Sequence, residues 1–254
     1  PVLSSAASDV YKRQSVDGNM VVSGITTLGS DAIINGITVG KGANSVNTNT
    51  AIGVNALDAS VTGVDNTAIG SGALTNLTTG ADNTGVGRLS LAAATTGSHN
   101  TAIGCESLDV VTTGDHNTGL GKAALGSITT ASDNTAVGSG AAGSSTGSNN
   151  TAVGRSSLNA NTTGERNTAV GTRSLENQTT GTLNTAYGYE SGQANNATGI
   201  TAIGYKALEA NTTANYNTAV GYEALRTNTT GGANGPNVAI GKFALFANTT
   251  GDNN

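Results

Sequence analysis

The chain has 254 residues, a formal net charge of −5 at pH 7, 37 glycines and only 3 % aromatic residues. This mild acidity argues against nucleic-acid binding through a basic surface, and the single cysteine excludes an intramolecular disulfide and a cysteine-rich metal site. No apolar run approaches the ~18 residues of a membrane-spanning helix. Charged residues are 11 % of the chain, less than half of the usual share, which disfavours an ordinary globular domain.

Residues 1–14 match no other part of the chain. The run from Ser4 to Gln14 resembles the translated adaptor read-through found at the ends of assembled metagenomic sequences. We therefore expect residues 1–14 to be a disordered sequencing artefact and exclude them from the fold. A natural disordered N-terminus is the alternative.

Residues 15–48 form a lead-in segment of short β-favouring runs separated by glycines. The runs cover residues 20–22, 25–28, 32–34 and 37–39. Such a pattern predicts strands joined by turns. Each run is too short to bury an apolar face by itself, so we expect it to pair with other chains or to lead into the repeats that begin at Asn49.

Residues 49–254 are an array of one repeated unit, seen clearly as Asn66-Thr67-Ala68-Ile69-Gly70. A fixed period over many copies is the signature of a repeat architecture. The period is 17 residues in most steps, 16 in two and 20 in the last, and the array looks truncated at its C-terminus. Copies begin at positions 49, 66, 83, 100, 117, 134, 150, 167, 184, 200, 217 and 237.

The repeat predicts an all-β fold, a parallel β-solenoid of about twelve 17-residue coils. Two or three glycines per repeat would each cost a helix about 1 kcal/mol, so a helical repeat is disfavoured. We expect each coil to hold two short strands and two turns. Equivalent asparagines would then lie above one another, where amide ladders can satisfy the buried turn.

Alternation along a strand places Thr67 and Ile69 on one side and Ala68 on the other. The Ile69 position is aliphatic in almost every copy, so we predict that it forms the core, and that the Ala68 position marks close approach of another backbone or chain. Gly70 suits a bend with positive φ. The predicted structural core is Ile52, Ile69, Val86, Ile103, Leu120, Val137, Val153, Val170, Ile203, Val220 and Ile240.

A second apolar position lies five residues after the first, as at Leu74, and is lost at Ala142 and Gly192 in the two 16-residue copies. Burial of two aliphatic side chains, at about 2 kcal/mol each, is small against the entropy of ordering a coil. We therefore expect several chains to associate through the Ala/Gly face, a homotrimer being the simplest case.

The copies at residues 167–171 and 217–225 resemble two related groups of proteins. One is the head of trimeric autotransporter adhesins, a left-handed parallel β-roll of three chains; the other is the repeat region of bacteriophage tail-fibre proteins. The likeness covers residues 15–254, and the lead-in segment looks more like the phage fibres. Adhesin heads carry a hydrophobic residue before the Ala, where this chain has Thr67.

The resemblance implies a structural and adhesive fibre, a homotrimer of the left-handed β-roll type that takes part in host-surface attachment on a virion. The alternative is the head of an adhesin on a bacterial cell surface. Contact with a host cell-surface glycan or protein is the expected partnership beyond self-association.

Tyr189, Tyr205 and Tyr222 share the slot after the glycine in three successive copies. An exposed aromatic ladder can stack on sugar rings, so these residues are the candidate surface or glycan contact. Tyrosines that merely cover the rod are the alternative.

His99 and His116 lie one period apart beside Asp115 and should stack, but two ligands are too few for a metal site. Cys105 occupies the outward slot without a catalytic base. We expect no metal, no cofactor and no enzymatic activity, because titratable residues do not converge in register.

The repeated threonines permit a second alternative, an ice-binding β-solenoid. Such a face needs Thr-X-Thr on a flat outward surface, whereas the turn pairs are adjacent, as in Thr162-Thr163, so their side chains diverge.

Overall fold

The structure is a computed structural model that describes residues 31–254 except 36, 60, 228–235, 250 and 252. The expected artefact, residues 1–14, and the two lead-in runs at 20–22 and 25–28 lie outside the described residues.

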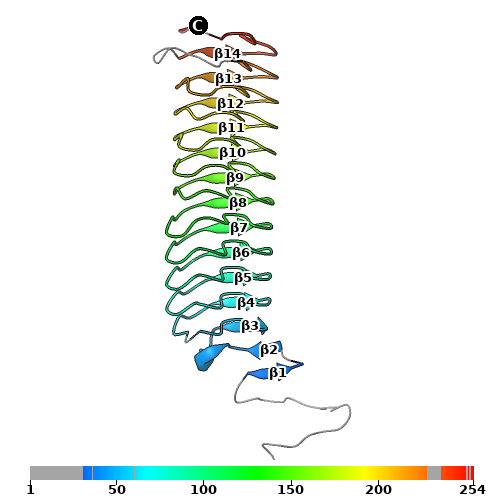
Figure 1. Cartoon of the computed structure of the whole chain (residues 1–254), viewed down its shortest axis with the longest axis vertical. Coiled ribbons are helices and arrows are strands. Elements are labelled where there is room, and N and C mark those ends of the chain that lie inside the picture. Colours follow the sequence, from blue (N-terminus) through cyan, green and yellow to red (C-terminus); the bar gives the residue numbers. More distant parts are fainter. Residues whose placement is uncertain (1–30, 36, 60, 228–235, 250, 252) are drawn as a thin grey trace, which may run out of the picture.

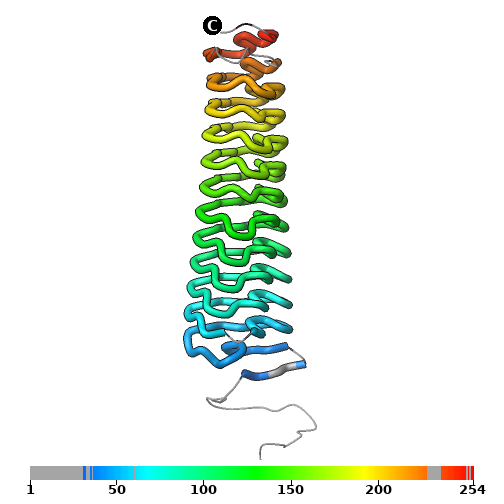
Figure 2. The backbone as a smooth tube through the Cα atoms, turned by 60° about the vertical axis from the view of Figure 1, so that its left-hand side comes forward, coloured from blue at the N-terminus to red at the C-terminus, as the bar shows by residue number. Residues whose placement is uncertain are grey.

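The described chain is an all-β parallel solenoid of about eleven turns with coils of about 17 residues, and it forms a straight stack (Figures 1 and 2). One sheet runs along it, with its strands in chain order. The strands are β1 (Ala32–Ile34), β2 (Ile37–Gly40), β3 (Thr50–Gly53), β4 (Thr67–Ile69), β5 (Thr84–Val86), β6 (Thr101–Ile103), β7 (Thr118–Leu120), β8 (Thr135–Val137), β9 (Thr151–Val153), β10 (Thr168–Val170), β11 (Thr185–Tyr187), β12 (Thr201–Ile203), β13 (Thr218–Val220) and β14 (Val238–Ile240).

The lead-in segment closes the N-terminal end of this sheet. β1 pairs antiparallel with β2, and β2 pairs antiparallel with β3. A short 3-10 helix, η2 (Ala43–Ser45), connects β2 to β3. The predicted strand–turn–strand character of residues 32–40 is therefore confirmed, and the hairpin covers the edge of β3 that would otherwise be unpaired.

From β3 onward each coil contributes one parallel strand, paired in strict register with the strands of the coils before and after it. The expectation of two strands per coil was wrong. The remainder of each coil consists of turns, in which residues such as Leu74 and Leu108 adopt positive φ. That conformation is costly for a residue with a side chain, so surrounding packing must hold it in place.

The prediction of which strand face points inward was also wrong. The alanines are fully buried, as at Ala68 and Ala102, whereas Ile69 is 37 % and Leu120 42 % exposed. The predicted core row therefore lies on the outer face of the sheet, half-buried or exposed at Ile52, Ile69, Val86, Ile103, Leu120, Val137, Val153, Val170, Ile203, Val220 and Ile240.

The interior of the coil gives the physical reason. At Gly85, in the alanine row of β5, an added Cβ would lie 3.0 Å from Ser90 Oγ and 3.3 Å from Leu74 Cγ. The inward space opposite the strand therefore holds a methyl group at most, and an isoleucine cannot enter it. The close neighbour of the alanine is the opposite wall of the same coil, so association of chains through the Ala/Gly face is excluded.

The second apolar position does form the core, as predicted. Its leucines from Leu57 to Leu225 are completely buried, and Ala142 takes the same place at 1 % exposure; Leu245, in the coil of β14, is the exception at 37 % exposure. In the coil that carries Gly192, the space is filled by neighbours, because an added Cβ would lie 2.8 Å from Leu175 Cδ2 and 3.3 Å from Ile200 Cδ1.

Asparagines at the start of each repeat form the predicted ladder. Asn83 donates from its backbone N and its Nδ2 to Asn66 Oδ1, at 3.0 and 3.1 Å, and Nδ2 also donates to Gly97 O at 2.8 Å. The same pattern recurs at Asn100 and Asn117. The position before β12 departs from this pattern, because Ile200 stands there in place of an asparagine and is buried at 1 % exposure.

A further buried row, not predicted from the sequence, changes its chemistry along the rod. Its members precede the turn that holds the Thr-Thr pair in most copies, and all of them are completely buried. The first five are apolar and the next five are polar: Val61, Leu77, Ala94, Val111, Ile128, Ser145, Asn161, Gln178, Asn195 and Asn211.

Glycine is required at the corner that ends or follows each of the strands β3–β13. Gly70 has φ 133°, and a Cβ there would lie 2.5 Å from Gly87 O in the next coil. The corner therefore needs both the positive φ and the close approach of a neighbouring backbone, as the sequence predicted.

Candidate surface-contact site

The slot after the corner glycine points outward, and it differs between the two ends of the rod. Along the earlier coils it holds small or charged residues such as Arg88, Lys122 and Ser139. On the coils of β11, β12 and β13 it holds Tyr189, Tyr205 and Tyr222 in succession. These tyrosines are 40–44 % exposed, so the structure places the predicted contact residues together on the surface.

The three tyrosines stack on one another along the rod. Ring centroids are 5.6 Å apart for Tyr189 and Tyr205 and 5.0 Å for Tyr205 and Tyr222, with the planes within 12° of parallel. Tyr222 and Phe243 form a T-shaped pair with ring centroids 5.5 Å apart, and Phe243 and Phe246 form a second T-shaped pair at the same distance. Since each ring covers its neighbour, the ladder presents mainly ring edges and hydroxyl groups to solvent.

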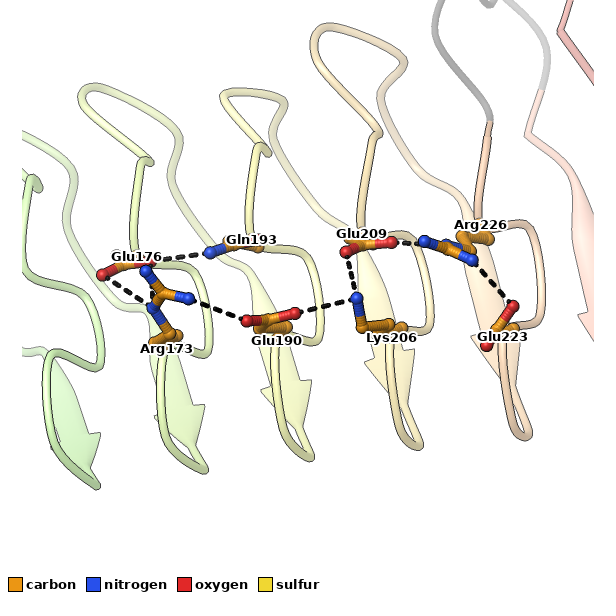
Figure 3. Close-up of polar contacts among 8 residues, drawn as sticks. All are labelled: Arg173, Glu176, Glu190, Gln193, Lys206, Glu209, Glu223 and Arg226. Atoms are coloured by element: carbon orange, nitrogen blue, oxygen red, sulfur yellow. Dashed lines mark hydrogen bonds and ion pairs between the residues drawn. The ribbon is translucent and has the colours of Figure 1, made fainter.

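Beside the tyrosines, charged side chains form a continuous network across four coils (Figure 3). Arg173 Nη1 lies 3.0 Å from Glu190 Oε1, and Lys206 Nζ lies 3.0 Å from Glu190 Oε2. Lys206 Nζ also lies 2.8 Å from Glu209 Oε1. Each pair joins one coil to the next or closes within a coil, so the network connects the coils of β10 to β12.

The network continues at both ends. Arg226 pairs with Glu209, and Arg226 Nη1 lies 3.0 Å from Glu223 Oε2. At the other end Arg173 Nε lies 3.1 Å from Glu176 Oε2, which also accepts a hydrogen bond from Gln193 Nε2 at 2.7 Å. The network therefore joins three cations to four carboxylates and carries one net negative charge, so every cation in it is already paired with at least one carboxylate.

These contacts shift the pKa values of residues in the network and of the neighbouring Tyr222. Burial raises the pKa of Glu190, but hydrogen bonds from Lys206, Tyr189 and Arg173 outweigh it and hold that pKa below its ordinary value. Hydrogen bonds to Glu209 and Glu190 raise the pKa of Lys206. A hydrogen bond to Glu223 raises the pKa of the Tyr222 phenol. All these shifts favour the ionised carboxylates and the protonated lysine and phenol.

Other aromatic and apolar side chains near the C-terminal end are more accessible than the ladder. Tyr187, on the outer sheet face, is 60 % exposed, and Tyr216, before β13, is 63 % exposed. Lys242 Nζ lies 5.0 Å from the Phe243 ring centroid, a cation–π geometry. The aromatic surface therefore extends from the ladder around the corner onto the sheet.

The other singled-out residues form no such surface. His99 and His116 stack with centroids 4.7 Å apart, as predicted, and His99 Nδ1 lies 3.7 Å from Asp82 Oδ2. Within the described residues no three His, Cys, Asp or Glu side chains are grouped to hold a metal ion. Cys105 is partly exposed, and its Sγ lies 3.4 Å from Arg88 Nη2.

The threonines form two rows that differ in the hydrogen bonding of their hydroxyl groups. In the turns, the first threonine of most pairs is bonded to the next coil: Thr78 Oγ1 donates to Thr95 O at 2.9 Å, and Thr95 Oγ1 donates to Thr112 O at 3.2 Å. The strand threonines, such as Thr67 and Thr101, lie on the outer sheet face, and their hydroxyls make no hydrogen bond to any described residue.

Comparisons with known proteins add no relative: no protein-family model, curated protein or solved structure matches this chain. In the described part of the chain no helix is long and apolar enough to span a membrane.

The charge network was missed at the sequence level, although its signal is present. Arg173, Glu190, Lys206 and Glu223 occupy one slot of four successive coils with alternating sign. In a solenoid, residues one period apart are neighbours, so alternating charge in one slot predicts ion pairs along the axis just as i, i+4 charges do on a helix.

Proposed function

We propose that this chain is the rod of a homotrimeric attachment fibre, most comparable to the tail fibre of a bacteriophage, that contacts the host surface through its aromatic end. The observation that carries the proposal is the solenoid of β3–β14 with a cluster of exposed aromatic side chains near its C-terminal end, consisting of Tyr187, Tyr189, Tyr205, Tyr222 and Phe243. The proposed role is mechanical and adhesive.

A stack of parallel strands in strict register supports the mechanical part. Neighbouring coils are bonded through the strands, through the turns and, except at Ile200, through the asparagine ladder. Bending the rod would break these bonds on one side, so the solenoid is suited to hold a contact surface at a distance from its base.

The aromatic cluster supports the adhesive part. Exposed apolar patches mark interaction sites, and tyrosine joins an apolar ring to a hydroxyl that can bind a polar partner. A surface glycan or protein of the host fits this chemistry. Because the stacked ring faces are covered, contact would use ring edges, hydroxyls and the open ring of Tyr187.

Adsorption of the labelled full chain to a panel of bacteria and to an array of bacterial surface polysaccharides tests this proposal. The triple variant Tyr189→Ser, Tyr205→Ser, Tyr222→Ser should lose binding. The matched control, Arg88→Ser, Lys122→Ser, Arg155→Ser, changes the same slot in other coils and should retain it. Equal adsorption by both variants would contradict the proposed contact. The complete gene and its neighbours distinguish a virion from a bacterial surface adhesin.

Ice binding is a second candidate, favoured by the row of strand threonines. Eleven of these, from Thr50 to Thr218, stand in register on one face beside aliphatic side chains, with hydroxyls that no described residue occupies. This candidate requires the face to remain open to water. Thermal hysteresis that is lost on Thr101→Asp and Thr135→Asp would support it, and absence of hysteresis at high protein concentration would remove it.

A further inference from the structure

The tyrosine ladder brings oxidisable phenol rings into contact on the surface of the rod. Tyr205 and Tyr222 are 40 % and 44 % exposed, their ring centroids are 5.0 Å apart, and their planes are 12° from parallel. A phenol that loses one electron and one proton becomes a radical, whose unpaired electron is shared with the ring carbons beside the hydroxyl. Two such rings held side by side can therefore join through a carbon–carbon bond.

Carboxylates beside the ladder can take the protons that such an oxidation releases. Tyr222 donates a hydrogen bond to Glu223, and Tyr189 donates one to Glu190. Glu223 is 8 % exposed and lies 3.0 Å from Arg226 Nη1, so its carboxylate is fixed beside the phenol. A positioned base that accepts the proton as the electron leaves makes the oxidation easier.

The ring distances indicate which pair couples. Tyr205 lies between two tyrosines, and its centroid is closer to Tyr222, at 5.0 Å, than to Tyr189, at 5.6 Å. On its other side Tyr222 meets Phe243 in a T-shaped pair, and phenylalanine has no hydroxyl to oxidise. The stack therefore favours a bond between Tyr205 and Tyr222.

A more exposed tyrosine nearby has no such neighbour. Tyr216 is 63 % exposed, and its ring lies against Gly199, where an added Cβ would be 2.7 Å from Tyr216 Cδ1. Among the described residues no tyrosine ring stacks on it. Tyr216 therefore provides a matched control for the ladder.

We propose that Tyr205 and Tyr222 form an oxidative cross-linking site, at which a dityrosine bond joins the coil of β12 to the coil of β13 (Figure 1). The oxidant is hydrogen peroxide, acting through a haem peroxidase. Each phenol loses one electron and one proton, the two radicals form the carbon–carbon bond, and the joined ring carbons release their hydrogens as the phenols recover theirs. The peroxide takes both electrons and both protons and becomes two molecules of water.

The bond ties together two positions that are one period apart. Tyr205 and Tyr222 are separated by 17 residues, so the bond closes a loop in the unfolded chain as a disulfide of that spacing does. The coils of β12 and β13 should therefore open less often. This inference does not depend on the attachment function, because the reaction requires only the rod and the oxidant.

Treatment of the full chain with hydrogen peroxide and a haem peroxidase tests the site. Dityrosine fluorescence should appear in chains that keep the mass of one chain on a denaturing gel, and digestion should release a joined peptide that contains Tyr205 and Tyr222, lighter than its two parts by two hydrogen atoms. Tyr205→Phe keeps the stacked ring without its hydroxyl and should lower the yield about ten-fold, because proximity drives the coupling. The control Tyr216→Phe should keep the parental yield.

Three results would overturn the proposal: fluorescence only in chains linked to one another, a joined peptide that contains Tyr189 in place of Tyr222, or equal yields from the two variants. Hydrogen exchange gives a second readout. In the oxidised chain, exchange in the coils of β12 and β13 should slow about 100-fold relative to the untreated chain, and the treated Tyr205→Phe variant should show no change. Equal exchange before and after cross-linking would show that the bond does not tie these coils together.

Discussion

Two regions of the rod have the same backbone and different chemistry. In the coils of β3–β7 the buried row before the turn is apolar, from Val61 to Ile128; in the coils of β8–β12 it is polar, from Ser145 to Asn211. The polar coils overlap the charge network and the tyrosine ladder. Since the strand register is unchanged throughout, the fold depends on the alanines, leucines, asparagines and corner glycines that both regions share.

The polar region replaces hydrophobic burial with hydrogen bonds between coils. Asn211 Nδ2 donates to Asn195 Oδ1 at 2.8 Å, and Asn195 Nδ2 donates to Gln178 Oε1 at 3.1 Å. A buried amide is tolerated only when its partners are present. The two regions should therefore respond in opposite ways to the same kind of substitution.

The largest effect is expected from placing an amide in the apolar region. Val111 lies between Ala94 and Ile128 in the buried row, which offer no side-chain partner. Val111→Asn should cost about 3 kcal/mol, from lost apolar burial and an unsatisfied amide. The control Val111→Ala should cost about 2 kcal/mol. Hydrogen exchange resolved by coil measures both; an equal cost for the two variants would show that this region accepts amides.

The next effect concerns the charge network, which lies in the C-terminal coils. Lys206→Met removes the cation shared by Glu190 and Glu209 and should destabilise the coils of β11–β13 by about 1–2 kcal/mol, since the network is partly exposed. Lys122→Met, in the same outward slot as the tyrosines but in the coil of β7, should change exchange rates little. Similar losses of protection in both variants would mean that the network does not stabilise its coils.

The same network should make the stability of the C-terminal coils depend on pH. The pKa of Glu190 is lowered in the folded chain, so its contribution is present above the ordinary glutamate value of about 4.3 and is lost as the pH falls through the folded pKa. The pKa of Lys206 is raised, so its contribution is present below about 10.4 and is lost as the pH rises through the folded pKa. Protection of the C-terminal coils should fall at both extremes in the wild type and fall less in Lys206→Met. A pH profile unaffected by the substitution would contradict this assignment.

A smaller and opposite effect is expected at the start of the polar region. Asn161 Nδ2 is bonded, but Asn161 Oδ1 is buried without a partner among the described residues. Asn161→Leu removes that acceptor and should stabilise its coil by about 1 kcal/mol. Asn195→Leu, which removes a satisfied amide, should instead destabilise by about 1–2 kcal/mol. The same sign for both changes would refute the distinction between the two amides.

The smallest effect is expected on the surface ladder. Tyr205→Ser leaves Tyr189 and Tyr222 without the ring between them and should cost up to about 1 kcal/mol. Serine occurs naturally in this slot at Ser139, so the fold should persist. Near-ultraviolet circular dichroism should lose the signal of the stacked rings; an unchanged spectrum would indicate that the stack does not exist in solution.

The sequence predicts the coil better than it predicts which way the strand faces. The period, the asparagine ladder, the buried leucines and the corner glycines can all be predicted from recurrence in register. The two faces of the strand are both apolar, so alternation between Ala68 and Ile69 has no inherent direction. The size of the space opposite the strand decides which face points inward. Leu74 and Ser90 on the far wall limit that space, and the pattern of the strand residues alone does not contain this information.

The surface features were also predictable from the sequence only in part. The tyrosine ladder was predicted because its members share one slot, whereas the covered ring faces depend on the rise between coils. The interruption of the asparagine ladder at Ile200 accompanies the loss of leucine at Gly192 in the preceding coil. Contact between these two positions across the interior explains two departures that look unrelated in the sequence.

Small-angle X-ray scattering of the full chain tests the central claim, that the chain is a thin solenoid which forms the rod of the proposed homotrimer. Eleven turns at about 4.8 Å each give a rod of about 53 Å for the array. We expect a particle of that length with three times the 24.8 kDa mass of the chain. A rod of the same length with the mass of a single chain would contradict the claim.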